Sequence, residues 1–199
     1  MMTRKIPFFE YPRLWTDSKQ EYISIFDHVA SSGGFILQKD LADFETELAK
    51  YTGVNYSVGV GNATDAMEIF LEAIGLNKGD EIIISSHTML ATASAIKFAG
   101  GVPVPVDIGE DNLICTDSIE NSITSNTIGI MPTQLNGRVC DMDKIIKIAQ
   151  KNNLFVVEDA AQALGAKFKG RHAGTFGLAS CISFFPAKVL GCFGDAGGV

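Results

Sequence analysis

The sequence predicts an α/β protein built on a mainly parallel sheet. Short β-rich runs alternate with stretches of helical periodicity along the 199 residues. Several of these runs are apolar at every position, which is typical of strands buried on both faces of a parallel sheet. Gly53, Gly75 and Gly100 follow three of the helical stretches, where glycine commonly ends a helix. We therefore expect right-handed crossovers and a ligand site at the carboxyl ends of the strands.

Each expected element rests on its local pattern. Helical periodicity covers 17–30 and 41–51, and the run YSVGV then predicts a first strand over 56–60. A helix over 64–74 leads to the strand EIIIS over 81–85, and a helix over 91–99 leads to the strand VPVPV over 102–106. The strand IGIMP over 128–132, a helix over 143–151 and the strands LFVV over 154–157 and CISFF over 181–185 complete the series.

Composition and charge favour small-molecule chemistry. The formal net charge is -7 and no basic run or aromatic-interleaved stripe occurs, so neither a nucleic-acid surface nor an anionic membrane is an expected partner. No stretch reaches the roughly 18 apolar residues that span a bilayer, and the N-terminus lacks the pattern of a signal peptide. Four cysteines without CxxC spacing and three histidines argue against a zinc site and a disulfide framework. A cytoplasmic protein with reduced thiols and no metal fits this usage best.

The first candidate site is the start of the expected helix at Gly61-Asn62-Ala63-Thr64-Asp65-Ala66. Small residues let a ligand approach the backbone, and the free amides at a helix N-terminus attract a phosphate. Thr64 would add a hydroxyl. The alternative is that Asn62 or Thr64 simply caps the helix.

The second candidate is Glu158-Asp159-Ala160-Ala161-Gln162, which follows a buried strand. Asp159 and Gln162 are three residues apart, so both side chains would share one face of a following helical turn. Asp159 would then pair with a buried cation of a ligand, and Gln162 would hold a neighbouring oxygen. The alternative is a helix N-terminus that merely favours negative charge.

The third candidate is Lys188, which follows the strand that carries Ser183. Most lysines lie on the surface, and that is the default for this one too. Its neighbours, however, are apolar: Phe184, Phe185, Val189, Leu190 and Phe193. Burial among them would favour the neutral, nucleophilic amine.

Together the three stretches supply what a pyridoxal phosphate site needs. A helix start would hold the phosphate, Asp159 would keep the pyridine nitrogen protonated, and Lys188 would form a Schiff base with the aldehyde. This combination makes a cofactor-dependent enzyme the leading interpretation.

On these residues the chain resembles the DegT/DnrJ/EryC1/StrS sugar aminotransferases, which have the aspartate aminotransferase-like fold. The resemblance runs from Gly34 to Asp195, and its most specific blocks are Glu158-Asp159-Ala160-Ala161-Gln162 and Ser183-Phe184-Phe185-Pro186 followed by Lys188. It implies the large domain of a three-layer, type I pyridoxal-phosphate transferase fold over 36–199, preceded by an N-terminal segment over 1–35 that packs near the substrate side. Family members continue beyond the position of Val199 into a C-terminal small domain, so the large domain is expected to be incomplete.

The resemblance also assigns roles by position. It implies that Lys188 forms the Schiff base, that Asp159 contacts the ring nitrogen and that Gln162 lies beside the ring hydroxyl. It implies further that Ala63, Thr64 and Ser183, with Asn62 beside them, hold the phosphate. Met89 stands where family members commonly stack an aromatic residue on the ring, and its sulfur would contact the π face.

The implied reaction transfers an amino group, with L-glutamate as the expected donor, to a keto group of a nucleotide-linked sugar. The implied assembly is a homodimer. A related dehydratase branch has histidine at the lysine position, so Lys188 favours transamination. Two alternatives stay open: a catalytically silent binding or regulatory module of the same fold, and an unrelated α/β nucleotide-binding domain in which Lys188 is structural.

Overall fold

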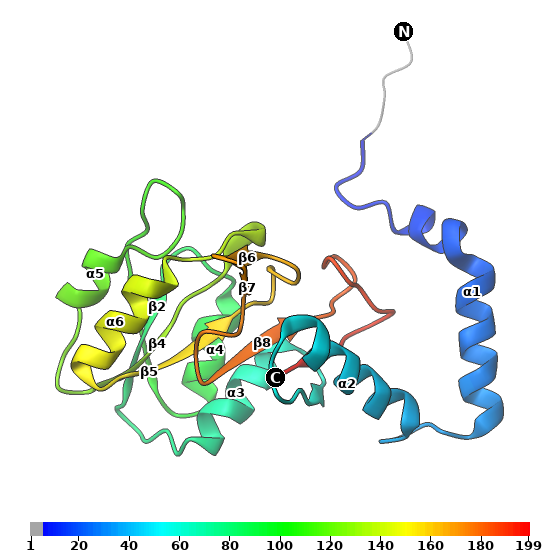
Figure 1. Cartoon of the computed structure of the whole chain (residues 1–199), viewed down its shortest axis with the longest axis horizontal. Coiled ribbons are helices and arrows are strands. Elements are labelled where there is room, and N and C mark those ends of the chain that lie inside the picture. Colours follow the sequence, from blue (N-terminus) through cyan, green and yellow to red (C-terminus); the bar gives the residue numbers. More distant parts are fainter. Residues whose placement is uncertain (1–5) are drawn as a thin grey trace, which may run out of the picture. The chain divides into compact units, whose positions relative to one another are not determined.

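The computed structural model describes residues 6–199 (Figure 1). These residues form two units, the first ending at Phe44 and the second running from Glu45 to Val199. In the first unit, helix α1 (Tyr11–Ser32) has a proline in its first turn, departs from helical geometry at Ser18 and ends at Gly33, whose φ is 71°. No residue of α1 is buried. Helix α2 (Lys39–Thr52) starts in this unit and continues into the second. The expected boundary after residue 35 falls inside the first unit, and its residues 1–5 lie outside the described range.

The second unit, from Glu45 to Val199, holds one large sheet. Within the described residues, seven strands pair in the order β1-β9-β8-β5-β4-β2-β3. They are β1 (Gly59–Val60), β2 (Glu81–Ser85), β3 (Val102–Val106), β4 (Thr127–Met131), β5 (Phe155–Asp159), β8 (Ala179–Ser183) and β9 (Gly197–Gly198). From β3 across to β8 the neighbours are parallel, whereas β9 is antiparallel to both β1 and β8. The expected mainly parallel sheet is confirmed.

Helices cover both faces of this sheet. They are α3 (Ala63–Ala73), α4 (Leu90–Phe98), α5 (Thr116–Asn121) and α6 (Met142–Asn152). A short 3-10 helix, η1 (Leu135–Gly137), and a hairpin of β6 (Lys167–Phe168) and β7 (Arg171–His172) lie in the connections.

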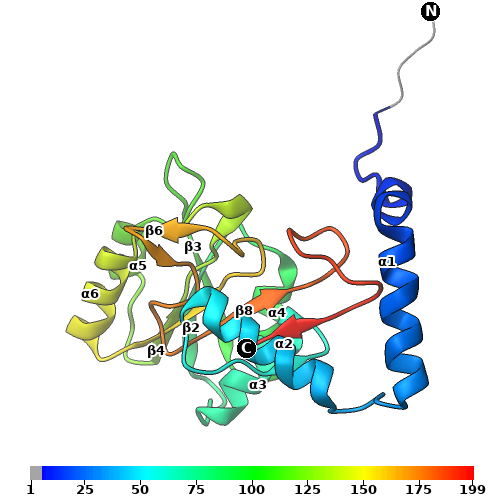
Figure 2. The same ribbon diagram turned by 45° about the vertical axis from the view of Figure 1, so that its right-hand side comes forward.

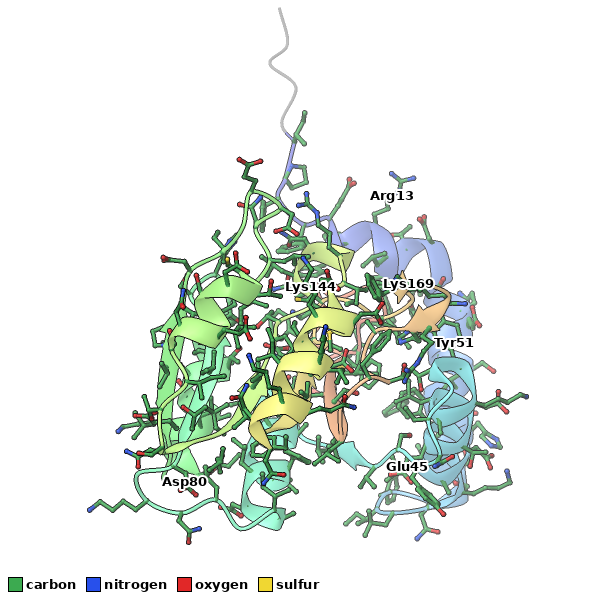
Figure 3. All side chains as sticks on the ribbon, turned by 60° about the vertical axis from the view of Figure 1, so that its left-hand side comes forward. Arg13, Glu45, Tyr51, Asp80, Lys144 and Lys169 are labelled. Atoms are coloured by element: carbon green, nitrogen blue, oxygen red, sulfur yellow. The ribbon has the colours of Figure 1, made fainter. Side chains whose placement is uncertain are left out.

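Alternate residues of each strand pack against different helices, which gives three layers. Ile83 belongs to a buried cluster with Ile119 of α5 and Ile145 of α6. Its neighbour Ile82 belongs to a second cluster with Met67 of α3 and other residues of α3 and α4. Figure 3 shows Lys144 on the outer side of α6, consistent with a helix that buries one face and exposes the other. The three-layer α/β architecture predicted from the sequence is confirmed.

The predicted elements match the observed ones most closely in the middle of the chain. The strands expected over 81–85 and 102–106 have the bounds of β2 and β3, and Gly53, Gly75 and Gly100 all have the positive φ of a residue that ends a helix. The first strand is shorter than expected, because only its end pairs with β9. The strand expected over 181–185 is shifted to Ala179–Ser183, since Phe184 instead bonds to Ala196 and Cys192 and closes a loop. None of the helices among residues 6–199 combines the length and apolarity that crossing a membrane requires.

Candidate active site

Two predicted site residues lie at the carboxyl ends of neighbouring strands. Asp159 is the last residue of β5, Ser183 is the last residue of β8, and the two strands pair with Asp159 opposite Cys181. Asp159 is 4% exposed and Ser183 is 8% exposed. The topology therefore brings both side chains to one edge of the sheet, where open α/β sheets bind ligands.

The N-terminus of α3 joins the same edge. Asn62 is its N-cap, and the Asn62 Oδ1 accepts a hydrogen bond from the Asp65 amide at 2.9 Å. Ala63 and Thr64 are the first two helical residues, so their amides have no acceptor within the helix. The capping interpretation of Asn62 is thus confirmed, and capping leaves two backbone donors free for an anion.

Glycine at position 197 allows α3 to approach β8. Gly197 pairs with Val60 on one side and with Ser183 on the other, and Figure 2 shows β9 beside β8. A Cβ atom at Gly197 would lie 2.4 Å from the carbonyl carbon of Asn62. Because only glycine fits there, Asn62, Ala63 and Ser183 lie close together, and we call this group the cradle.

Asp159 is surrounded by hydrogen-bond donors. The Thr92 hydroxyl of α4 donates to Oδ2 at 2.7 Å, and the Ala161 amide and the Cys181 thiol donate to Oδ1 at 3.2 and 3.5 Å. Burial raises the pKa of the Cys181 thiol well above its usual range, and the Asp159 charge acts in the same direction. Cys181 therefore remains a protonated donor. Both carboxylate oxygens of Asp159 are thus held by donors at the edge of the sheet where a ring nitrogen would bind.

The expected helical turn after Asp159 is wrong. Residues 160–163 form a turn closed by a hydrogen bond from the Ala163 amide to the Ala160 carbonyl at 3.0 Å. Gln162 is oriented by the segment after β4, since its Oε1 accepts the Asn136 amide at 3.1 Å and its carbonyl accepts the Gly137 amide at 2.9 Å. No helix N-terminus follows β5, so the alternative explanation for the acidic pair is excluded as well.

Glu158, the residue before Asp159, is held by hydrogen bonds within the fold. It is fully buried, and its carboxylate accepts from Gln134 Nε2 and from the amides of Gly174, Phe176 and Gly177 at 2.6–3.1 Å. These bonds tie the loop before β8 to β5. Because four donors already occupy the Glu158 carboxylate, it has no free acceptor for a ligand at the cradle.

Lys188 lies in the loop after β8, and its amide donates to the Phe185 carbonyl at 2.8 Å. Its side chain is half-buried, and among residues 6–199 it makes no hydrogen bond or ion pair. The expected apolar enclosure of Lys188 is wrong in part. Of the five apolar residues expected around Lys188, Phe184 is buried and the other four are exposed. They are Phe185, Val189, Leu190 and Phe193, at 47–78%. Residues 184–196 form a loop rather than a strand. Their side chains therefore lack the regular alternation that would direct every second one into the core.

Met89 is the N-cap of α4, one turn before Thr92. Its side chain is 66% exposed, so its thioether is open to a ligand rather than packed in the core. Met89 thus lies at the start of α4, the helix that also carries Thr92, whose hydroxyl donates to Asp159.

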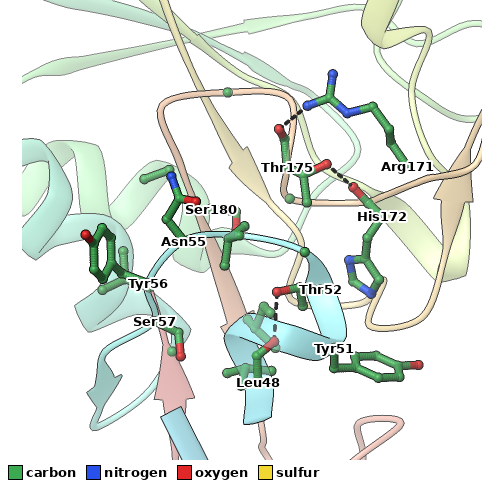
Figure 4. A pocket seen from close by; sticks show the side chains of 18 of the residues that line it. Leu48, Tyr51, Thr52, Asn55, Tyr56, Ser57, Arg171, His172, Thr175 and Ser180 are labelled. Atoms are coloured by element: carbon green, nitrogen blue, oxygen red, sulfur yellow. Dashed lines mark hydrogen bonds between the residues drawn. The ribbon is translucent and has the colours of Figure 1, made fainter. Parts of the chain in front are cut away.

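A cavity of about 750 Å³ lies elsewhere in the second unit (Figure 4). It is flanked by residues 53–57, by 177–180 at the amino-terminal end of β8 and by Arg171 and His172. None of the eight predicted site residues lines it. The hydroxyls of Thr52 and Thr175 donate to the Leu48 and His172 carbonyls at 2.8 and 2.7 Å, so they are already satisfied. This cavity therefore lies at the amino-terminal end of β8, away from the predicted site residues at its carboxyl end.

The residues at the carboxyl edge fit pyridoxal phosphate. Two amides at the start of α3 without an acceptor in the helix suit a phosphate, and the buried Asp159 carboxylate suits the ring nitrogen. Lys188, whose amine makes no hydrogen bond or ion pair within residues 6–199, follows the strand between them. Sequence reasoning assigned no role to Thr92, Thr88, Thr133 and Cys181, which support Asp159 directly or in series. Thr133 and Cys181 lay at the ends of expected strands, but nothing in the sequence marked Thr88 or Thr92 as partners of Asp159.

Comparisons with known proteins agree with this geometry. The model of the DegT/DnrJ/EryC1/StrS aminotransferase family matches residues 16–199. The dTDP-3-amino-3,4,6-trideoxy-alpha-D-glucose transaminase of Streptomyces venezuelae is 37% identical over 198 residues, which cover 99% of this chain and 52% of that protein. The chain spans about half the length of the curated relatives it matches.

Solved structures show the same fold. DesV of S. venezuelae, in complex with a ketimine intermediate, superposes with a TM-score of 0.93 at 36% identity over 98% of this chain and 53% of that one. NtdA of Bacillus subtilis, with bound cofactor PMP, superposes with a TM-score of 0.91 at 36% identity over 100% of this chain and 45% of that one. These likenesses establish the large-domain architecture of the pyridoxal-phosphate aminotransferases. By its family match and its fold, the chain belongs to the DegT/DnrJ/EryC1/StrS aminotransferase family, whose cofactor is pyridoxal phosphate.

Proposed function

We propose that the chain carries the cofactor-binding part of a transaminase that moves an amino group from L-glutamate to a keto group of a nucleotide-linked sugar. The observation that carries the proposal is Asp159, a buried carboxylate that faces only donors and lies beside the cradle. A relative named as a dTDP-sugar transaminase supports the substrate class.

The residues have distinct roles in this proposal. When bound, pyridoxal phosphate supplies an aldehyde carbon for the amino group and a ring that takes up an electron pair. The amides of Ala63 and Thr64 and the hydroxyls of Thr64 and Ser183 bind the phosphate, with Asn62 holding the helix end in place. Asp159 holds a proton on the ring nitrogen through its carboxylate.

Three further residues act at the ring and at the reacting carbon. Gln162 is oriented by the backbone at Asn136 and Gly137, and we assign its amide to the ring hydroxyl. Met89 contacts the ring face. Lys188 would hold the cofactor through Nζ, and its amine would act as a general base toward the substrate carbon.

We also propose a homodimer in the cytoplasm, with residues 36–199 as the cofactor domain. Tyr56, Leu178 and Val189 are 72–85% exposed, and exposed apolar side chains of this size are typical of surfaces that associate. The four free cysteines suit a reducing compartment.

The test is covalent labelling. We expect the chain to develop a visible absorbance band on addition of pyridoxal phosphate, and borohydride reduction to place the label on the peptide that contains Lys188. Lys188→Ala should lose both band and label, whereas Lys97→Ala, at an exposed lysine of α4, should keep them. A label on other lysines that persists in Lys188→Ala contradicts the proposal.

Addition of L-glutamate separates the enzyme from a silent module of the same fold. An enzyme will convert the bound aldehyde form to the amine form, so the band will disappear at a rate that rises with glutamate concentration. A band at Lys188 that is indifferent to glutamate favours the silent module.

A further inference from the structure

Three threonine hydroxyls form a continuous hydrogen-bonded row that ends on Asp159. Thr133, just after β4, bonds to Thr88 at 2.8 Å between the two Oγ1 atoms. Thr88, in the segment between β2 and α4, bonds to Thr92 at 2.7 Å, and Thr92 bonds to Asp159 Oδ2 at 2.7 Å. Thr92 is fully buried and Thr133 is 3% exposed. Three separate segments of the chain thus converge on one carboxylate oxygen.

The row has a single direction. A carboxylate only accepts, so the one hydroxyl hydrogen of Thr92 must point at Asp159. Thr92 then has only lone pairs for Thr88, so Thr88 donates to Thr92. By the same argument Thr133 donates to Thr88. Hydroxyls aligned head to tail polarise one another, which strengthens the bond at the end of the row.

The other carboxylate oxygen is bound independently. Oδ1 accepts from the Ala161 amide and the Cys181 thiol, which come from the turn after β5 and from β8. Of the described side chains that bond to Asp159, Cys181 is the one that titrates, and it stays protonated. Thr92 is therefore the one described donor to Oδ2.

We propose that Thr92, with Thr88 and Thr133 behind it, is a positioning residue that keeps Asp159 ionised and aimed at the cofactor ring nitrogen. The inference rests on the proposed function. The row does not act on the substrate. It favours the charged form of Asp159, because a hydrogen bond to a charged acceptor stabilises that form over the protonated one.

A purely structural role for Thr92 makes a different prediction. Helix α4 is also anchored by Ala95 and Ile96, both fully buried, so loss of one hydroxyl will leave the helix in place. A tie between α4 and the sheet would affect unfolding and leave the titration of Asp159 unchanged. The titration therefore separates the two roles.

The experiment measures the carboxyl ¹³C shift of Asp159 against pH in the cofactor-free full chain, with Asp159→Asn to assign the signal. In Thr92→Val we expect the midpoint for proton uptake by Asp159 to rise by about one pH unit or more. Thr92→Ser keeps the hydroxyl and should return the midpoint toward that of the unchanged chain. Thr88→Val should shift it in the same direction by less.

Thr52→Val is the matched control, because Thr52 is also a buried helical threonine but donates to the Leu48 carbonyl. It should leave the midpoint unchanged. An unchanged midpoint in both Thr92→Val and Thr88→Val overturns the inference. If Thr92→Val fails to fold, Thr88→Val alone decides.

A second measurement links the row to the cofactor. With ¹⁵N-labelled pyridoxal phosphate bound, Thr92→Val should shift the pH at which the ring nitrogen loses its proton, and Thr92→Ser should not. A chain that never binds the cofactor refutes the proposed function, while the carboxyl titration still reports on the threonine row. A bound cofactor with no change in either titration refutes the row alone.

Discussion

Glu158 and Asp159 are adjacent carboxylates whose surroundings give them different tasks. Consecutive residues of a strand point to opposite faces, so the two side chains face different environments. Glu158 accepts from three backbone amides of residues 174–177 and from Gln134. Asp159 accepts from two side chains and one amide at the carboxyl edge of the sheet. At the scale of single residues, the partners decide which carboxylate is structural and which is available for chemistry.

Glu158→Gln should destabilise the fold. The side-chain NH₂ group would face donors, and at least one buried amide would lose its acceptor, which costs about 2–3 kcal/mol. Urea unfolding monitored by circular dichroism measures this loss. Glu120→Gln is the control, because Glu120 pairs with Lys151 at 3.0 Å on the surface, and its loss should cost less than about 0.5 kcal/mol. Equal free energies of unfolding for both variants would contradict the structural role of Glu158.

The cysteines should differ sharply in reactivity. Hydrogen bonds from the Ser118 side chain and backbone lower the pKa of the half-buried Cys115 thiol, whereas burial raises the pKa of Cys140 to about 12. The thiolate is the nucleophile, so iodoacetamide at neutral pH should alkylate Cys115 and spare Cys140. Mass spectrometry of the native protein across pH measures both rates.

Ser118→Ala should move the pH profile of Cys115 alkylation upward, because the thiolate loses its hydrogen bond. Ser122→Ala, one turn further along, should leave that profile in place. An identical profile for Cys115 in the unchanged chain and in Ser118→Ala would be evidence against the assigned cause.

At the scale of elements, the N-terminus of α3 shows what the sequence could and could not predict. The helical periodicity over 64–74 after an expected strand predicted the helix, and Asn62 was already a candidate cap. The close approach to β8 was not predictable, because it depends on Gly197, which lies more than a hundred residues away in the chain and pairs with both Val60 and Ser183. Long-range pairing of this kind leaves no local signal.

Asn62→Asp tests whether this helix end binds a phosphate. Aspartate caps a helix as well as asparagine, so the free energy of unfolding should change by less than about 0.5 kcal/mol. A negative charge near the phosphate should weaken pyridoxal phosphate binding about tenfold or more. Absorbance titration with the cofactor, run beside urea unfolding, measures both quantities.

The matched control is Asp141→Asn at the N-cap of α6, where Oδ1 of Asp141 accepts the Lys144 amide at 3.2 Å. It also keeps a capping side chain while changing the charge, but it lies at a helix end with no proposed ligand. Cofactor affinity should be unchanged. Unchanged cofactor affinity in Asn62→Asp would contradict the assignment of the phosphate site to the N-terminus of α3.

At the scale of the whole molecule, the fold was predictable because its signal is repeated. Five parallel strands, several of them apolar on both faces, each separated from the next by a helix or a long connection, leave few topologies open. The loop over 184–196 was not predictable, because its run of aromatic residues resembles a buried strand. The backbone hydrogen bonds of Phe184 with Ala196 and Cys192 show that β8 has ended before this run. Local hydrophobicity therefore overstated the burial around Lys188.

The two units should differ in local stability. All three hydrophobic clusters lie in residues 45–199, whereas α1 has no buried residue. Phe26 of α1 and Phe98 at the end of α4 are similarly exposed, at 76% and 67%, but α4 is anchored by Ala95 and Ile96. A protease needs local unfolding of the helix, and α1 has few buried contacts to oppose that opening.

Chymotrypsin should thus cut after Phe26 at least about tenfold faster than after Phe98, since each 1.4 kcal/mol of opening free energy is a factor of ten. A time course of native digestion by mass spectrometry measures both rates, and in strong urea they should converge. Equal rates under native conditions would mean that α1 is held as firmly as the core of the second unit.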